Sequence, residues 1–393
     1  MREKVELPPP DSGKPSDLLV IAGEHSGDQH AARMVRGLLK DNPDLSVSAV
    51  AGKALDSAGA QVIFDLTRHS VVGFVEVIRN YGFFKEIFDG IIAWIEEHRP
   101  RNVCLVDFPG FNLRLARELF RRKLSRKGGG AIAVLYYISP QIWAWKAGRR
   151  FKMAEWLDDL GVIFPFEVEC YADTDLPVTF VGHPFLADDH QPLLHYDVDG
   201  PILLLPGSRR QPVNRIFPAM LDTFLRLHED LSGLRSAVVF PDDGVRAVIE
   251  DVLASRPGSA EFCSPVPVGD PVGGRAVLTS SGTISLACGI AGIPGAIAYR
   301  AHPITCLWGR FLIQVPYLGI VNLLLDRPEY PEYIQSRAKP VDLCRELRSA
   351  IENPTRIESA LTCAENLRRL LAVDGDVPDA AAWLSNSMVL PDS

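Results

Sequence analysis

The chain has 393 residues, with 41 Lys and Arg against 49 Asp and Glu, a formal net charge of −8 and 47% apolar residues. This length suits two domains of ordinary size, and the composition excludes disordered, collagen-like and low-complexity proteins. No apolar run approaches the roughly 18 residues that a membrane-spanning helix needs, and the first residues lack the apolar segment of a signal peptide. The seven cysteines are scattered and never spaced as C-x-x-C, which argues against a disulfide framework and a zinc site. We therefore expect a cytoplasmic protein.

Short runs rich in leucine and β-branched residues alternate with helical patterns along the chain. The runs expected to be strands are residues 18–23, 102–108, 131–138, 178–182, 202–207, 236–241, 276–282 and 295–300. Helical patterns include residues 31–40, 215–231 and 244–253. Near-continuous apolar strands that alternate with helices are typical of a parallel sheet covered on both faces. The predicted class is α/β, with doubly wound, Rossmann-like parallel sheets.

A stretch rich in Pro and Asp, residues 186–201, interrupts this alternation and reads as an interdomain linker. The predicted domains are therefore residues 16–190 and residues 200–345. In open α/β sheets, ligands bind at the carboxyl ends of the strands. We expect the two domains to face a central cleft that holds the ligands.

The first expected strand ends in the sequence AGEHSGD (22–28), and a helix follows. Glycines at such a turn let the backbone approach a ligand, and the free N–H groups of the helix attract anions. The spacing is not that of the dinucleotide fingerprint G-x-G-x-x-G, which disfavours a nicotinamide dehydrogenase. Alternatively, the glycines only permit a tight turn and Asp28 caps the helix. The candidate ligand contacts here are Gly23, Ser26, Gly27 and Asp28.

Two turns in the second half suit a diphosphate. The sequence PGSRR (206–210) follows a buried strand, and guanidinium groups offer paired donors to phosphate oxygens. The sequence SSGT (280–283) places hydroxyls and a glycine where another strand meets a helix, so that backbone N–H groups and the helix dipole can bind an anion. The alternative for the first turn is an ordinary helix N-cap by Ser208. The candidate residues are Gly207, Ser208, Arg209, Ser281, Gly282 and Thr283.

Asp107 follows an expected buried strand in the sequence VDFPGFN (106–112). Partial burial can raise the pKa of such a carboxyl group towards working pH, which suits a general base. The structural alternative is helix capping by Asp107 or Asn112. Beyond it, the sequence SPQIWAWK (139–146) carries two tryptophans that either pack in a core or line a sugar or acyl pocket.

Residues 82–98 form an apolar helical stripe with surplus aromatic side chains. The stripe fits a helix that faces the core, or a patch that rests on a membrane or grips acyl chains. The candidate membrane or acyl contacts are Phe83, Phe84, Phe88 and Trp94.

Seven Lys and Arg between residues 114 and 127 fit a phosphate-bearing ligand, an anionic surface or a solvated helix face, whereas nucleic acid is not expected. The histidines show no metal-ligand spacing, so no metal site is predicted.

These motifs, taken in order, resemble the lipid-A-disaccharide synthase family of bacterial glycosyltransferases. The resemblance covers residues 18–335. The motifs that carry it are AGEHSGD (22–28), VVGFVEVI (71–78), VDFPGFNLRLA (106–116), YYISPQIWAWKAGRRFK (136–152), FPFEVECY (164–171), VGHP (181–184), LLPGSRR (204–210), SSGTISL (280–286) and PYLGIVNLLLDRPEYPEYIQ (316–335).

The resemblance implies a GT-B fold, a C-terminal segment (346–393) that crosses back to the first domain, and no metal or other cofactor. It implies the transfer of 2,3-diacylglucosamine from UDP-2,3-diacylglucosamine to 2,3-diacylglucosamine 1-phosphate, which gives a β-1,6-linked disaccharide 1-phosphate and UDP. Asp107 matches an aspartate of the family's D-x-P-D-F-N segment and is the first choice for the base, with Glu24 second. Asn322 and Gln335 lie in the matching late segment and are candidate donor or product contacts. Members of the family are cytoplasmic and peripheral to the inner membrane, and a homodimer is compatible with the resemblance.

Some positions depart from the family pattern. Gly110 stands where the family usually has Asp, Tyr136 where it has His, and Ala287 where a Glu often follows S-G-T-x-x-L; Pro212 and Val321 also differ. Two alternatives therefore stay open. One is an enzyme like UDP-GlcNAc 2-epimerase, against which the apolar segment argues. The other is a divergent protein that binds nucleotide or lipid without catalysis.

Overall fold

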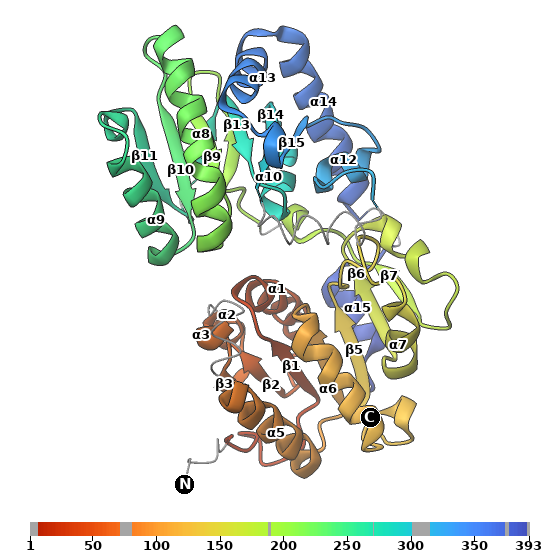
Figure 1. Ribbon diagram of the computed structural model, residues 1–393. Coiled ribbons are helices and arrows are strands. Elements are labelled where there is room, and N and C mark those ends of the chain that lie inside the picture. Colours follow the sequence, from red (N-terminus) through yellow and green to blue (C-terminus); the bar gives the residue numbers. More distant parts are fainter. Residues whose placement is uncertain are drawn as a thin grey trace. The chain divides into compact units, whose positions relative to one another are not determined.

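The structure is a computed structural model that describes residues 7–70, 81–187, 190–269, 271–300, 315–373 and 377–390 (Figure 1). The chain forms two compact units, which are described separately. The first unit comprises Met1–Pro184 and Leu371–Ser393, and the second comprises Phe185–Leu370. The motif at residues 71–78 lies outside the described residues.

The first unit contains a seven-stranded parallel sheet with the order β3-β2-β1-β4-β5-β6-β7. Its strands are β1 (Leu18–Ala22), β2 (Val47–Ala51), β3 (Gln61–Asp65), β4 (Asn102–Val106), β5 (Ala133–Tyr137), β6 (Asp159–Val162) and β7 (Val178–Phe180). Its helices are α1 (His25–Asp41), α2 (Lys53–Ser57), α3 (Thr67–Ser70), α5 (Tyr81–His98), α6 (Pro109–Arg121), α7 (Arg149–Trp156) and α15 (Ala380–Ser387).

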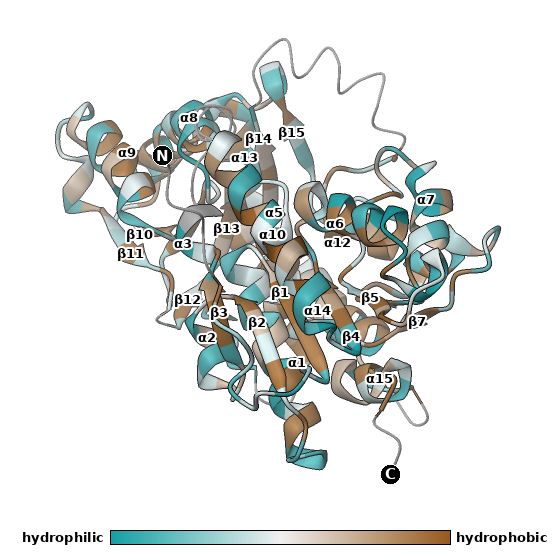
Figure 2. Ribbon diagram, turned by 90° about the horizontal axis from the view of Figure 1, so that it is seen from below, coloured by the Kyte–Doolittle hydropathy of each residue, from teal (hydrophilic) through white to brown (hydrophobic). Residues whose placement is uncertain are grey.

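Helices cover both faces of this sheet. Along β1, Leu19 and Ile21 pack into one apolar cluster with side chains from α5, α6 and α7, while Leu18 and Val20 pack into another with α1, α2 and α15. Every residue of β1 is accordingly hydrophobic and buried (Figure 2). This arrangement confirms the predicted doubly wound class.

The last helix of the chain belongs to the first unit. The Trp383 indole on α15 donates to Asp159 Oδ1 at 3.0 Å, and the Ser387 hydroxyl donates to Asp159 Oδ2 at 2.9 Å. The ring of Trp383 also lies 3.0 Å from where a Cβ on Gly161 would be, so glycine permits this close approach. A C-terminal segment thus fixes the start of β6.

The second unit has a six-stranded parallel sheet with the order β11-β10-β9-β13-β14-β15 and a two-stranded parallel sheet of β12 and β8. Its strands are β8 (Leu194–Tyr196), β9 (Ile202–Leu205), β10 (Ser236–Phe240), β11 (Cys263–Pro267), β12 (Val272–Gly274), β13 (Ala276–Thr279), β14 (Gly295–Tyr299) and β15 (Glu332–Ile334). Its helices are α8 (Arg210–Asp230), α9 (Asp243–Ala254), α10 (Thr283–Ala291), α12 (Ile320–Leu325), α13 (Pro340–Glu352) and α14 (Pro354–Leu371).

The unit boundaries differ in detail from the expected ones. The expected linker (186–201) contains β8, which pairs with β12. The second unit also continues past residue 345 to Leu370, because α13 packs on α8 and buries Leu343 and Leu347. Within the expected C-terminal segment, α15 lies in the first unit, whereas most of α14 lies in the second.

Candidate active site

The candidate site of the first unit lies at the carboxyl edge of its sheet. Strands β1, β4, β5 and β6 are parallel neighbours, and Ala22, Val106 and Tyr137 are paired in register at their ends. The segments that follow these strands therefore share one edge. They carry Glu24 after β1, Asp107 after β4, the segment 139–148 after β5, and Glu167 after β6.

Asp107 lies in a strained turn between β4 and α6. Asp107 and Phe108 are consecutive left-handed residues, with φ of 46° and 48°. This backbone conformation costs roughly 1–3 kcal/mol for each residue other than glycine. Hydrogen bonds hold the turn: Asp107 N donates to Tyr137 O at 2.9 Å, and Asp107 O accepts from the Tyr136 hydroxyl at 2.6 Å and from Asn112 Nδ2 at 2.9 Å. The histidine of the family pattern is thus replaced by a tyrosine that supports the candidate base.

The electrostatic environment of Asp107 suits a proton acceptor. Burial raises the pKa of this carboxyl group to about 6, the negative charge of Glu24 adds to the shift, and a backbone hydrogen bond from Phe108 opposes it. A carboxyl group with this pKa is mostly ionised at pH 7 yet holds a proton more readily than an exposed aspartate. The alternative of helix capping is wrong, since Phe108 is the N-cap of α6 and no side chain caps it. Asn112 instead donates to the carbonyl groups of Ile21, Val106 and Asp107.

Glu167 is a second carboxyl group at the carboxyl edge of the seven-stranded sheet, and it was not among the site residues predicted from the sequence. Its side chain is 1% exposed, accepts from Phe164 N at 3.1 Å and lies 3.3 Å from the donating Trp143 indole nitrogen. Burial raises the pKa of Glu167 to about 8, these hydrogen bonds oppose the shift, and the charge of Asp107 adds to it. Glu167 is therefore mostly neutral at pH 7 and anchors the Trp143 segment. Its only signal was its place in the FPFEVECY motif.

Asp28 is a structural residue, which corrects its assignment as a substrate contact. Its carboxylate is 1% exposed and accepts the backbone N–H groups of Gly52 at 3.0 Å, Ala54 at 3.0 Å and Leu55 at 3.2 Å. It therefore satisfies the orphan donors at the start of α2, not those of its own helix.

Gly23, Ser26 and Gly27 of the AGEHSGD turn remain candidate ligand contacts, and Gly23 also has a packing role. A Cβ on Gly23 would lie 2.4 Å from the Phe108 ring, so this glycine allows the two turns of the edge to pack together. Glu24 is the half-buried N-cap residue of α1, and no side chain caps this helix. Ser26 is exposed in the first turn, and Gly27 is buried against Val106.

The two expected phosphate turns of the second unit lie side by side. Strands β9 and β13 pair, with Leu205 opposite Thr279, and Ser280 N donates to Leu205 O at 2.8 Å. Gly207 and Gly282 have φ of 116° and 136°, and a Cβ on Gly207 would lie 3.1 Å from Ser280 Oγ. The sequence therefore needs glycine in both turns.

The polar groups of these turns are accessible. Ser208, Arg209 and Thr283 are exposed, while Ser281 and Gly282 are half-buried. The N-cap of α8 is Arg209, without a side-chain hydrogen bond, so the alternative of capping by Ser208 is wrong. Within the described residues Arg209 forms no ion pair, and its guanidinium is available to a phosphate.

The two late candidates differ in their surroundings. Asn322 is fully buried: its Nδ2 donates to Tyr330 O at 2.7 Å and to Glu332 Oε1 at 3.0 Å, and its Oδ1 accepts from Tyr330 N at 2.9 Å. It therefore has a structural role, which corrects its assignment as a donor contact. Gln335 follows β15 at the carboxyl edge, half-buried and with φ of 55°, so it remains a candidate.

The apolar segment on α5 is mostly part of the core. Trp94 is 3% exposed, and its indole donates to Pro8 O at 2.8 Å, which corrects its assignment as a membrane contact. Phe88 packs edge-on against Phe111, whereas Phe83 and Phe84 are half-buried near the start of the helix. None of the helices searched among the described residues is long and apolar enough to cross a bilayer.

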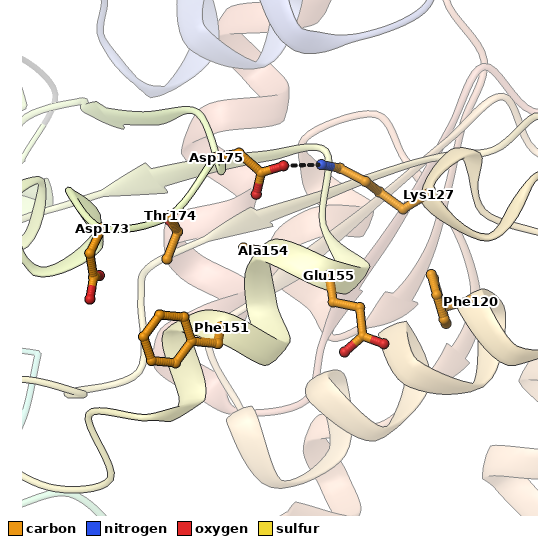
Figure 3. A pocket seen from close by; sticks show the side chains of 8 residues that line it. All are labelled: Phe120, Lys127, Phe151, Ala154, Glu155, Asp173, Thr174 and Asp175. Atoms are coloured by element: carbon orange, nitrogen blue, oxygen red, sulfur yellow. Dashed lines mark ion pairs between the residues drawn. The ribbon is translucent and has the colours of Figure 1, made fainter.

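An open hollow of about 690 Å³ lies between α6, α7 and the segment before β7 (Figure 3). Phe120, Phe151, Glu155 and a weak ion pair between Lys127 and Asp175 line it. Phe120 lies near the C-terminal end of α6 and Lys127 follows that end, away from the sheet edge that carries Asp107, so we assign the hollow no role in catalysis. Among the described residues, no group of three or more His, Cys, Asp or Glu could hold a metal ion.

Comparisons with known proteins agree with the motifs. The family described as "Lipid-A-disaccharide synthetase" matches residues 18–373. A lipid-A-disaccharide synthase of Legionella pneumophila (strain Lens) is 34% identical over 366 residues, covering 91% of this chain and 94% of the relative. A lipid-A-disaccharide synthase of Geobacter metallireducens is 32% identical over 369 residues, covering 91% of this chain and 94% of the relative.

Solved structures with low sequence identity share the fold. The UDP-GlcNAc 2-epimerase from Neisseria meningitidis has a TM-score of 0.60 at 12% identity, covering 94% of this chain and 98% of that chain. The glycotransferase of kitacinnamycin has a TM-score of 0.59 at 12% identity, covering 96% of this chain and 100% of that chain. These likenesses confirm the expected GT-B class and concern the fold alone.

Proposed function

The chain belongs to the lipid-A-disaccharide synthase family of glycosyltransferases, and we propose that it catalyses this reaction with Asp107 as the general base. The donor is UDP-2,3-diacylglucosamine, and the acceptor is 2,3-diacylglucosamine 1-phosphate. The products are the β-1,6-linked disaccharide 1-phosphate and UDP.

The chemistry is a displacement with inversion. The Asp107 carboxylate takes the proton of the acceptor's 6-hydroxyl while that oxygen attacks the anomeric carbon of the donor. The bond between the anomeric carbon and the UDP oxygen breaks, and the electron pair leaves with UDP. Arg209 and the backbone N–H groups at the starts of α8 and α10 stabilise the negative charge on the diphosphate.

The observation that carries the proposal is the environment of Asp107. Its carboxyl group lies at a strand end with a pKa raised to about 6 by burial and by Glu24. The backbone that presents it is strained and held by three hydrogen bonds. Strain of this kind is typical of functional sites. A Cβ on Gly110 would meet no atom within 4 Å, so this position has room for the aspartate that the family usually has.

The test incubates the purified chain with both substrates and follows UDP and disaccharide together. We expect equal amounts of the two, and no UDP release when the acceptor is omitted. A 2-epimerase would instead convert UDP-GlcNAc to its 2-epimer without any acceptor. A binding protein that lacks turnover would give neither product, and either outcome would contradict the proposal.

Arg209→Ala is expected to weaken UDP binding by about tenfold, since a charge-assisted hydrogen bond contributes about 1.5–3 kcal/mol. Isothermal titration calorimetry with UDP measures the effect. Arg226→Ala is the matched control, because Arg226 is exposed near the other end of the same helix. Equal UDP affinity in the two variants would remove Arg209 from the diphosphate site.

We further propose that the start of α5 contacts the cytoplasmic face of the inner membrane. Phe84→Ser is expected to weaken binding to anionic vesicles by about fivefold, because a half-buried phenylalanine contributes about half of its 1.5–3 kcal/mol transfer free energy. Val341→Ser is the control, since it removes a 51% exposed side chain from α13 of the second unit. Unchanged vesicle sedimentation for Phe84→Ser, with unfolding temperature preserved, would favour the purely structural role of this helix.

A further inference from the structure

The segment between β5 and α7 has no assigned role, although it lies at the edge of the sheet that carries Asp107. β5 pairs with β4 up to the last residue of each strand, Tyr137 opposite Val106. The segment after β5 therefore begins beside the Asp107 turn. The buried Glu167 carboxyl group, 3.3 Å from the Trp143 indole nitrogen, holds this segment in place.

An exposed aromatic ring and two cations occupy the end of this segment. Lys146 Nζ lies 4.3 Å from the centre of the Trp145 ring, and the guanidinium carbon of Arg149 lies 5.0 Å from it. The Trp145 side chain is 42% exposed, Lys146 is exposed and Arg149 is half-buried. Contact with the ring already restricts the two cationic side chains, so they lose less conformational entropy when they bind a ligand.

These cations differ from their neighbours in having no carboxylate partner within the described part of the chain. Nearby, Arg150 pairs with Asp173 at 2.5 Å and Lys152 with Glu155 at 2.7 Å. In the basic cluster on α6, Arg121 and Arg122 both pair with Glu118. Positive charge therefore remains uncompensated at Lys146 and Arg149.

The charge of Arg149 reaches the Asp107 turn. Burial raises the pKa of Tyr136 well above its ordinary value, Asp107 adds to the shift, and Arg149 opposes it. Tyr136 is the residue whose hydroxyl donates to Asp107 O. An anion bound at Arg149 would therefore lie within electrostatic reach of the hydroxyl that supports the Asp107 turn.

We propose that Trp145, Lys146 and Arg149 form a subsite for the phosphate monoester of the acceptor. The cations bind the phosphate oxygens, Arg149 with its paired donors and Lys146 as a point charge. The apolar ring of Trp145 lies beside the sugar that carries the phosphate. The inference rests on the proposed function, because only an acceptor with a phosphate group needs such a subsite.

The test measures binding of a short-chain, water-soluble diacylglucosamine 1-phosphate, and of the same compound without phosphate, in the absence of donor. We expect the wild-type chain to prefer the phosphorylated compound by at least tenfold. Arg149→Ala should weaken its binding by about tenfold, and the double variant with Lys146→Ala by about 30-fold or more. Binding of the compound without phosphate should stay unchanged. Lys152→Ala is the matched control, since Lys152 lies on the same helix and is paired with Glu155.

The outcomes separate this inference from the proposed function. Disaccharide formation by a wild-type chain that shows no phosphate preference would overturn the subsite and leave the enzyme. Phosphate-dependent binding lost in Arg149→Ala, without disaccharide formation by the wild type, would support the subsite and overturn the proposed function. Sedimentation with phosphatidylglycerol vesicles provides a third arm. Loss of vesicle binding in the double variant, with soluble acceptor binding unchanged, would assign this surface to lipid and overturn the subsite.

Discussion

Asp107→Asn is expected to lower kcat by about 10²-fold or more, because the amide cannot accept the proton of the acceptor's hydroxyl. The fold should survive the change. Burial raises the pKa of Asp107 in the folded chain above its value in the unfolded chain. The free energy of unfolding therefore falls as the pH rises above the unfolded-state pKa and the group ionises. Replacement by a neutral isostere removes this decrease, and we expect the free energy of unfolding at pH 7 to be unchanged or higher. Steady-state kinetics and thermal unfolding of the same preparation measure both quantities.

Asp65→Asn is the matched control for this variant. Asp65 ends β3 at the same edge of the same sheet, where it pairs with Arg68 at 2.8 Å. We expect nearly normal kcat for the control. If Asp107→Asn retains normal turnover while Glu24→Gln loses about 10²-fold, the base is Glu24 and our assignment is wrong.

Asp28→Ala should lower the free energy of unfolding by about 3–5 kcal/mol, because three backbone N–H groups at the start of α2, two of them buried, lose their charged acceptor. For a unit of this size, the unfolding temperature should fall by roughly 10 °C. Differential scanning calorimetry measures the shift. UDP affinity of the folded protein, measured below the transition, should not change.

The control for Asp28→Ala is Asp56→Ala. Asp56 is exposed in the first turn of α2, so its loss should cost less than about 1 kcal/mol. A stable Asp28→Ala variant with weakened UDP binding would restore the role that the AGEHSGD motif first suggested for this residue.

Much of the fold could be predicted because the central strands are continuous apolar runs. All eight expected runs contain strands, from β1 at Leu18–Ala22 to β14 at Gly295–Tyr299. The strand β6 was missed because Gly161 interrupts its short apolar pattern. That glycine is explained by Trp383, a contact across more than 200 residues that periodicity does not report. The strand β8 was missed because its segment is rich in Pro and Asp, and it forms only by pairing with β12.

The site residues also differ in whether a local sequence pattern or a contact between distant segments determines their role. Residue type and position after a strand predicted Asp107, Gly207 and Arg209, which remain candidates. The same reasoning misassigned Asp28 and Asn322, because their hydrogen-bond partners lie 8 to 27 residues away in sequence. It also missed Glu167, whose chemistry depends on burial and not on a local pattern.

The pH dependence of kcat/KM tests whether Asp107 acts as the base with a pKa set by burial and by Glu24. The acceptor's own phosphate titrates near pH 6, so wild type and Glu24→Gln must be compared on the same substrates. We expect activity to fall as the pH drops through about 6 in the wild type, since protonated Asp107 cannot accept a proton. Loss of the Glu24 charge lowers the pKa of Asp107 and should move this fall to lower pH. An acid limb at the same pH in both proteins would show that Asp107, with its pKa raised by Glu24, is not the base.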